Sequence, residues 1–236
     1  MAERPLDLAA LSKALAEQGL ILRGGFHPEP VDTLPPLPDG AAAETLLLVG
    51  NAGPDLWRVF ETSPEHLDGT RDPLNRWTER VVGALAEATG ATALYPFGGP
   101  PYWPFVAWAK RCEPVAESPI GMLIHPDYGL WHAYRAALLL PERLALPPRD
   151  ASAIPCERCQ HRPCLASCPV GAFDMSGYDV GACAGHLDRP EGEDCMTMAC
   201  RARRACPAGA AFAYEPAQAA FHMTAFLDNR RQGVSP

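Results

Sequence analysis

The chain has 236 residues, of which 47% are hydrophobic and 20% charged, and its formal net charge is −8 at pH 7. This length and hydrophobic content predict one medium domain or two small ones with a real core, which excludes a mainly disordered protein. The acidic charge argues against nucleic acid as a main partner. No uninterrupted apolar run reaches the ~18 residues of a membrane span, so no membrane partner is expected.

The N-terminal stretch is amphipathic and lacks the basic and apolar regions of a signal peptide. Disulfide-bonded exported proteins usually carry such a signal. The nine cysteines therefore indicate reduced thiols in the cytoplasm that are available to bind metal.

Helices and strands alternate through the first 145 residues. Helical spacing of apolar residues predicts helices over 6–18 and 72–89, with a shorter helix over 54–60. Short apolar runs predict strands at 20–22, 45–49 and 91–95. The GNAG sequence that follows residue 49 matches neither the dinucleotide nor the P-loop pattern, so it is interpreted as a strand-to-helix turn. This alternation predicts a layered α/β or α+β fold.

Two later stretches precede the cysteines. Residues 95–105 form a stiff loop rich in aromatic residues and proline, which is typical of core cover but could also pack a large flat ligand. Residues 120–140 contain two apolar arms on either side of Asp127-Tyr128-Gly129, which predicts a β-hairpin. A proline-rich linker over 141–155 follows.

Eight of the nine cysteines lie between residues 156 and 206. The first group has the spacing C-x2-C-x4-C-x3-C-P and the second C-x4-C-x5-C-P, and both end in Cys-Pro-x-Gly-Ala. Bacterial two-cluster ferredoxins use C-x2-C-x2-C-x3-C-P, in which the fourth cysteine binds the other cluster. The Gly-Ala after each Cys-Pro is expected to let backbone approach a cluster and donate N–H bonds to sulfur.

Crossed ligation of this kind predicts two [4Fe–4S] clusters. The first would be held by Cys156, Cys159, Cys164 and Cys206, and the second by Cys168, Cys183, Cys195 and Cys200. Cys112 is left over as an ordinary core thiol. Two structural zinc sites and disulfides are weaker alternatives, because zinc ribbons do not need proline after the fourth ligand and no export signal is recognised. The arginines between residues 201 and 204 could raise a cluster potential, dock an acidic donor or form a solvated face.

With these residues in view, HPDYGLWHAYRAALLLP followed by the linker and the cysteines resembles epoxyqueuosine reductase. The same phrase is similar to CblC-type vitamin B12 processing proteins. The resemblance covers residues 95–207 and implies an α+β fold: a nitroreductase-like (CblC-type) domain followed by a bacterial-ferredoxin-like 2[4Fe–4S] domain. It implies a corrinoid-binding-like domain over 1–150, a dicluster ferredoxin domain over 151–215, and a C-terminal helix and tail over 216–236. Cys183 takes the place of that family's extra cluster ligand.

The resemblance also implies a cobalamin site. Its expected residues are Phe97, Gly98, Gly99, Tyr102 and Trp103 of the aromatic loop, together with Ile124, His125, Pro126, Tyr128, Gly129 and Trp131 of the hairpin. The reductase family carries its proton-donating acid in an Asp-Thr-Gly-Pro phrase, whereas the corresponding residues 97–100 here include no carboxylate. Only 30 residues follow Cys206, where that family has a long tRNA-binding tail, so tRNA modification is not expected.

Three functions follow from these observations. The first is an iron–sulfur, corrinoid-dependent oxidoreductase that reduces or processes cobalamin or uses it on a small substrate, with an electron-donor protein as partner. The second is a ferredoxin-type electron-transfer protein without corrinoid. The third is a redox sensor whose clusters are structural or sensory. No catalytic residue is assigned.

Overall fold

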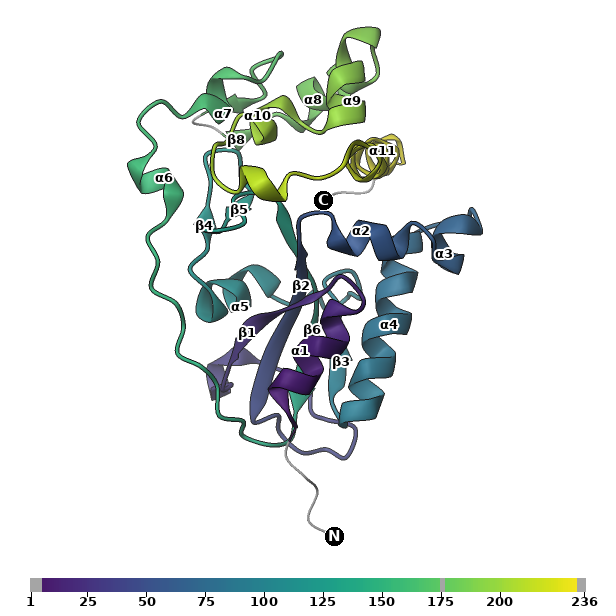
Figure 1. The fold of residues 1–236 in the computed structure, drawn as a ribbon, viewed down its shortest axis with the longest axis vertical. Helices are drawn as coiled ribbons and strands as arrows, with labels where there is room; N and C mark the ends of the chain where they lie inside the picture. Colours follow the sequence, from purple (N-terminus) through teal and green to yellow (C-terminus); the bar gives the residue numbers. More distant parts are fainter. Residues whose placement is uncertain (1–5, 175–176, 233–236) are drawn as a thin grey trace. The chain divides into compact units, whose positions relative to one another are not determined.

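A computed structural model describes residues 6–174 and 177–232 of the chain (Figure 1). The chain forms a mixed α/β fold with two compact units. The first unit comprises Met1–Pro114 and His132–Ala151, and the second comprises Val115–Trp131 and Ser152–Pro236. The sequence predicted a domain boundary at residue 150, and in the structure residues 115–131 group with the cysteine-rich part.

A four-stranded antiparallel sheet organises the first unit, in the order β1-β2-β6-β3. Its strands are β1 (Ile21–Phe26), β2 (Thr45–Ala52), β3 (Thr92–Leu94) and β6 (His132–Leu140). The two central strands pair from Thr45 opposite Leu140 to Ala52 opposite His132. Their apolar runs, at 46–49 and 136–140, are buried on both faces, which is why these strands show no alternation of polar residues.

Helices cover this sheet (Figure 1). α1 (Leu8–Ala16) and α5 (Phe105–Cys112) contact β1, and α4 (Pro73–Thr89) contacts β3 and β6. α2 (Asp55–Phe60) and α3 (Pro64–Leu67) follow β2, and a 3₁₀ turn, η1, spans Pro30–Asp32. Asp7 accepts hydrogen bonds from the first turn of α1, and Gly90 ends α4 in the left-handed region. The helices and strands predicted for residues 6–95 are confirmed, with boundaries that differ by a few residues.

The second unit is built from short elements around the cysteines (Figure 1). Its strands are β4 (Ala116–Glu117), β5 (Leu123–Ile124), β7 (Phe173–Asp174) and β8 (Gly177–Tyr178). Its helices are α6 (Pro155–Arg158), α7 (Pro163–Ala166), α8 (Val180–Leu187), α9 (Glu193–Met198), α10 (Arg201–Arg204) and α11 (Pro216–Arg231), with 3₁₀ turns η2 (Pro190–Gly192) and η3 (Ala210–Phe212). Across the described part of the chain, none of the helices has both the length and the apolar character needed to cross a membrane.

The hairpin predicted over 120–140 is wrong beyond its turn. His125 and Gly129 exchange two backbone hydrogen bonds of 2.9 Å, which closes the expected turn. The arm before the turn pairs with β4 instead, and β6 pairs with β2 and β3. The reason is that the continuous apolar run of β6 requires a strand on each side, a demand that local pattern does not reveal.

Glycine fixes the 115–131 segment against the loop that follows Cys206. Gly129 and Gly209 both have positive φ, at 56° and 68°. A Cβ on Gly129 would lie 1.9 Å from the carbonyl oxygen of Ala208, and a Cβ on Gly209 would lie 2.2 Å from that of Tyr128. Backbone therefore packs directly on backbone, at a distance that no other residue type permits.

This contact predicts that Gly129→Ala is much more destabilising than a matched change. Gly121 also has positive φ, at 77°, but nothing lies within 4 Å of its Cβ position. Gly121→Ala should lower the unfolding free energy only by the strain of alanine in the left-handed conformation, about 1 kcal/mol. Gly129→Ala adds the clash and should cost at least ~3 kcal/mol. Chemical denaturation of the two variants measures the difference, and equal losses would contradict the proposed packing.

Candidate metal and corrinoid sites

Four of the cysteines surround one small cavity in the second unit. Cys156, Cys159, Cys164 and Cys206 line it, together with apolar residues that include Ile124 and Leu130. Cys156 lies in α6, Cys164 in α7, and Cys206 two residues after α10. The 115–131 segment thus contributes one wall of this first cysteine cavity, although it lies far from the cysteines in sequence.

The other four cysteines surround a second cavity in the same unit. Cys168, Cys183, Cys195 and Cys200 line it with Phe173, Leu187 and Met223 among others. Cys183 lies in α8 and Cys195 in α9, while Cys168 and Cys200 flank α7 and α10. The structure therefore brings the eight cysteines together in the two sets expected from crossed ligation. That these sets hold iron–sulfur clusters stays a prediction.

Two short helices join the cavities. α7 carries Cys164 of the first set and is followed by Cys168 of the second, and α10 is preceded by Cys200 of the second set and followed by Cys206 of the first. The two helices contact each other, and residues of both sets pack around the buried side chains of Ile124, Leu130 and Ala202. Both cavities are therefore bordered by α7 and α10.

The pKa shifts of the thiols divide the cysteines into the same two sets. Burial raises the pKa of Cys156, Cys164 and Cys206, and thiols of the first set raise it further. Burial also raises the pKa of Cys183 and Cys200, and the neighbouring thiols there belong to the second set. Clustered thiols of raised pKa bind protons at neutral pH unless a cation stabilises the thiolates, so these residues suit a metal site.

Backbone N–H groups also approach sulfur at both Cys-Pro turns. The Ala172 N–H donates to Cys168 Sγ at 3.3 Å, and the Ala208 N–H donates to Cys206. Both donors lie in the Cys-Pro-x-Gly-Ala phrases, as expected from the sequence. Hydrogen bonds of this kind stabilise negative charge on sulfur and are one determinant of cluster potential.

Both cysteine cavities are small. Their volumes are ≈ 40 Å³ and ≈ 20 Å³, far below the ~300 Å³ of a pocket for an organic ligand. Within residues 6–174 and 177–232, no three His, Cys, Asp or Glu side chains converge as they would around a single metal ion.

The basic run after Cys200 is engaged inside the second unit. Arg201 and Arg204 both form ion pairs with Asp194. Arg203 donates two hydrogen bonds to the Leu130 carbonyl, at 3.1 and 2.7 Å, and lies 4.4 Å from the ring centres of both Trp131 and Tyr214. Arg203 therefore fixes the end of the 115–131 segment, which is a structural role.

The predicted corrinoid residues of the 115–131 segment lie around its turn. His125 Nδ1 accepts the Asp127 N–H at 3.1 Å, and the His125 ring stacks on Tyr128 with centroids 4.4 Å apart. Tyr128 in turn meets Phe212 edge-on, and Trp131 meets Tyr214. Ile124, His125 and Trp131 are buried, Gly129 contacts Ala208 as described, and Pro126 is half-buried. Packing within the second unit thus holds these side chains in place.

The predicted corrinoid residues of the aromatic loop belong to the first unit. Phe97 stacks on Tyr95 with Arg135 5.5 Å from its ring centre, and Trp103 stacks on Trp108. Gly98 is exposed, and a Cβ on Gly99 would lie 2.3 Å from the ring of Tyr102, which is itself 75% exposed. That these residues and residues 124–131 bind a corrin stays a prediction.

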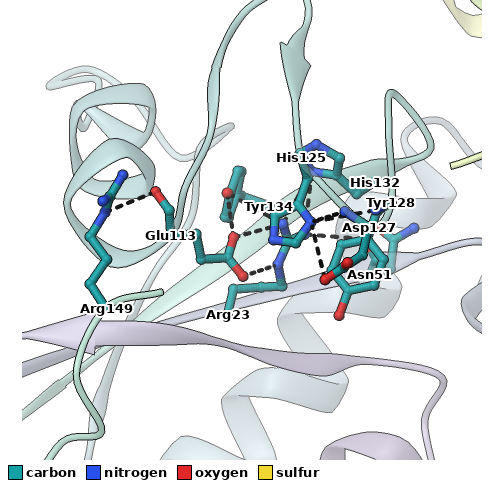
Figure 2. A network of polar contacts seen from close by, with 9 residues as sticks. All are labelled: Arg23, Asn51, Glu113, His125, Asp127, Tyr128, His132, Tyr134 and Arg149. Atoms are coloured by element: carbon teal, nitrogen blue, oxygen red, sulfur yellow. Dashed lines mark hydrogen bonds and ion pairs between the residues drawn. The ribbon is translucent and has the colours of Figure 1, made fainter. Parts of the chain in front are cut away.

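The first unit also contains a buried polar network that sequence reasoning missed (Figure 2). Arg23 forms a two-point ion pair with Glu113, with both N···O distances at 2.7 Å, and is fully buried. The Tyr134 hydroxyl donates to the same carboxylate at 2.6 Å, and Arg23 donates to His132 Nδ1 at 3.3 Å. The sequence signal that could have revealed this network is Arg23, a charged residue in a strand that otherwise contains only apolar residues and glycine.

Comparison with known proteins gives distant structural likenesses. No protein-family model matches the chain, and no curated protein sequence matches it. An epoxyqueuosine reductase from Streptococcus thermophilus aligns at 12% identity over 86% of this chain and 66% of its own, with a TM-score of 0.45. Another epoxyqueuosine reductase, solved with a modified tRNA stem loop, aligns at 15% identity over 89% and 68%, with a TM-score of 0.41. The C. elegans B12-trafficking protein CblC aligns at 16% identity over 91% and 89%, with a TM-score of 0.46.

The grouping of cysteines predicts the effect of removing Cys206. Cys206 lines the cavity with Cys156, Cys159 and Cys164, so if the cavities hold the predicted clusters, Cys206→Ala should disturb the one at the 156–164 loop. The predicted cluster at Cys200, which is nearer in sequence, should survive. EPR of the reduced variant distinguishes the two, and Cys112→Ala, outside both sets, is the control. Loss of only the Cys200 cluster would contradict the grouping.

The buried ion pair predicts a large cost for removing its cation. Arg23→Met leaves the Glu113 carboxylate without its main partner in a buried setting and should cost about 3–5 kcal/mol of unfolding free energy. Arg58→Met removes an exposed pair with Asp55, whose side chains are 58% and 70% exposed, and should cost at most ~1 kcal/mol. Denaturant titrations compare the unfolding free energies of the two variants. Similar losses would show that the Arg23–Glu113 pair contributes no more to stability than the exposed Arg58–Asp55 pair.

Proposed function

We propose that the protein is an iron–sulfur, corrinoid-dependent oxidoreductase that reduces or processes cobalamin. The observation that carries this proposal is the composition of the second unit. The 115–131 segment, which contains the predicted corrinoid residues His125 and Tyr128, supplies Ile124 and Leu130 to the first cysteine cavity. A cluster in that cavity would lie beside the segment expected to contact the corrin.

The cysteines would hold the two clusters. Helices α7 and α10, which each connect a cysteine of one set to a cysteine of the other, would keep the clusters close enough for electrons to pass. When bound, the clusters supply electrons singly and the corrinoid supplies a reducible cobalt. The chain's own residues shield the site: Ile124, Leu130 and the prolines around Cys156 and Cys206 form an apolar wall at the first cavity. An electron-donor protein would deliver electrons to the second set of cysteines, whose cavity is not lined by the 115–131 segment.

The histidines bear on how a corrin would be held. His125 Nδ1 accepts a backbone N–H and His132 Nδ1 accepts from Arg23, so in each neutral ring the proton lies on Nε2. A histidine that binds metal through Nε2 donates its other N–H to an acceptor, which is the opposite arrangement. These hydrogen bonds would therefore disfavour either histidine as a ligand of cobalt. A cobalt without such a ligand is easier to reduce.

One observation favours the alternative, a ferredoxin-type electron-transfer protein without corrinoid. The rings of Tyr128 and Trp131 already have partners within the second unit, in Phe212, Tyr214 and Arg203. Aromatic side chains with complete packing partners need no ligand to explain them. Cluster content and corrinoid binding must therefore be measured separately.

The experiment is anaerobic reconstitution followed by corrinoid binding. Iron and sulfide should each approach about eight per chain, since each cubane contains four of both. Hydroxocobalamin should then be retained through desalting, and a reductant should shift the visible spectrum to that of Co(II) or Co(I). Full iron content with no retained corrinoid would leave the electron-transfer alternative in place of the oxidoreductase. Iron near four per chain would mean that one cavity holds no cluster.

A further inference from the structure

Each cysteine cavity contains one polar side chain whose hydrogen-bonding capacity is unused. Ser118 lines the first cavity and His186 lines the second. Within the part of the chain that the structure describes, Ser118 Oγ and His186 Nε2 are buried and have no hydrogen-bond partner. A buried polar atom without a partner loses its hydrogen bonds to water with no replacement, so such atoms are rare unless a ligand or water completes them.

The positions of these two residues are set by the fold. His186 follows Cys183 by three residues in α8, so both lie on the same face of that helix, toward the second cavity. Ser118 begins the turn between β4 and β5, which is closed by the Met122 carbonyl accepting from the Ser118 N–H at 2.9 Å. Ser118 is only 8% exposed. The two side chains come from different segments, yet each meets one set of thiols.

The surroundings of these atoms select the kind of partner. Apart from Arg162 in the first cavity and Arg201 in the second, the remaining lining is apolar side chain and sulfur. Thiolates and bridging sulfides accept hydrogen bonds, and a hydroxyl or an imidazole N–H can donate them. One acceptor sulfur would be enough to satisfy the donor group of either side chain.

We propose that Ser118 Oγ–H and His186 Nε2–H each donate a hydrogen bond to sulfur of the cluster in their own cavity and raise its reduction potential. This inference rests on the proposed function, because it requires that both cavities hold clusters. Adding an electron makes the cluster sulfurs more negative, so a donated hydrogen bond stabilises the reduced form more than the oxidised form. Ser118 would thus couple the 115–131 segment to the first cluster by a polar contact.

Paired variants test the proposal, each serving as the control for the other. Ser118→Ala should shift the midpoint potential of the first cluster to a more negative value and leave the second unchanged. His186→Leu should shift the midpoint potential of the second cluster to a more negative value and leave the first unchanged. A shift of tenfold in the reduction equilibrium corresponds to about 59 mV for a one-electron couple. EPR-monitored redox titration measures both midpoints, and the Cys206→Ala variant assigns the signals to the cavities.

Conservative variants separate donation from packing. Ser118→Thr and His186→Gln keep a donor and should stay close to the wild-type midpoints. Unchanged midpoints in both donor-lacking variants would overturn the proposal, and so would equal shifts of both clusters in either variant. Loss of iron in His186→Leu and His186→Gln would make His186 a ligand, which also overturns its role as a donor.

A measurement on the wild-type protein avoids dependence on any variant that fails to fold. In protein labelled with ¹⁵N-histidine, pulsed EPR of the second cluster should detect weak coupling to one histidine nitrogen. Absence of coupling would overturn the assignment of His186. Iron content is determined first on the same sample: a chain without iron fails the proposed function, whereas a chain with about eight irons and no coupling fails only this inference.

Discussion

The contact of two peptide groups, one after Tyr128 and the other after Ala208, determines the construction of the cysteine-rich unit. Only glycine at positions 129 and 209 allows it, since a Cβ on either residue would overlap the opposing backbone. The contact fixes the turn at His125–Gly129 beside the loop that follows Cys206. Arg203 adds a second attachment through the Leu130 carbonyl. Ile124 and Leu130 can line the first cysteine cavity because both attachments hold the 115–131 segment in this place.

Much of the cysteine arrangement could be predicted because its constraints are local. Short spacings bring three thiols of the first set to one loop, and the paired Cys-Pro phrases indicate that the fourth is exchanged between the sets. The strands and helices of residues 6–95 were predictable for a similar reason, since each has its own apolar period. The hairpin over 120–140 could not be predicted correctly, because the choice of partner for β6 depends on β2 and β3, which are distant in sequence.

Most residues that sequence reasoning missed share one property, because their significance depends on contacts between distant segments. Ser118 has no motif around it and lies 38 residues before Cys156, whose cavity it lines. Arg23 and Glu113 are 90 residues apart and form a pair only because β1 and α5 pack together. His186 was the most accessible of the missed residues. Its spacing of three from Cys183 already places both on one face of a helix.

The 115–131 segment has a consequence for the ancestry of the chain. A ferredoxin module that is continuous in sequence can be transferred between genes as a single cassette and can remain intact after fusion. Here the cysteine-rich unit includes a segment that lies within the sequence of the first unit, and Gly129 and Gly209 on its two parts pack against each other's backbone. Recombination at the linker over 141–155 would separate the cysteines from one wall of their own cavity. Selection would therefore act on the two parts of the chain together and would keep glycine at both position 129 and position 209.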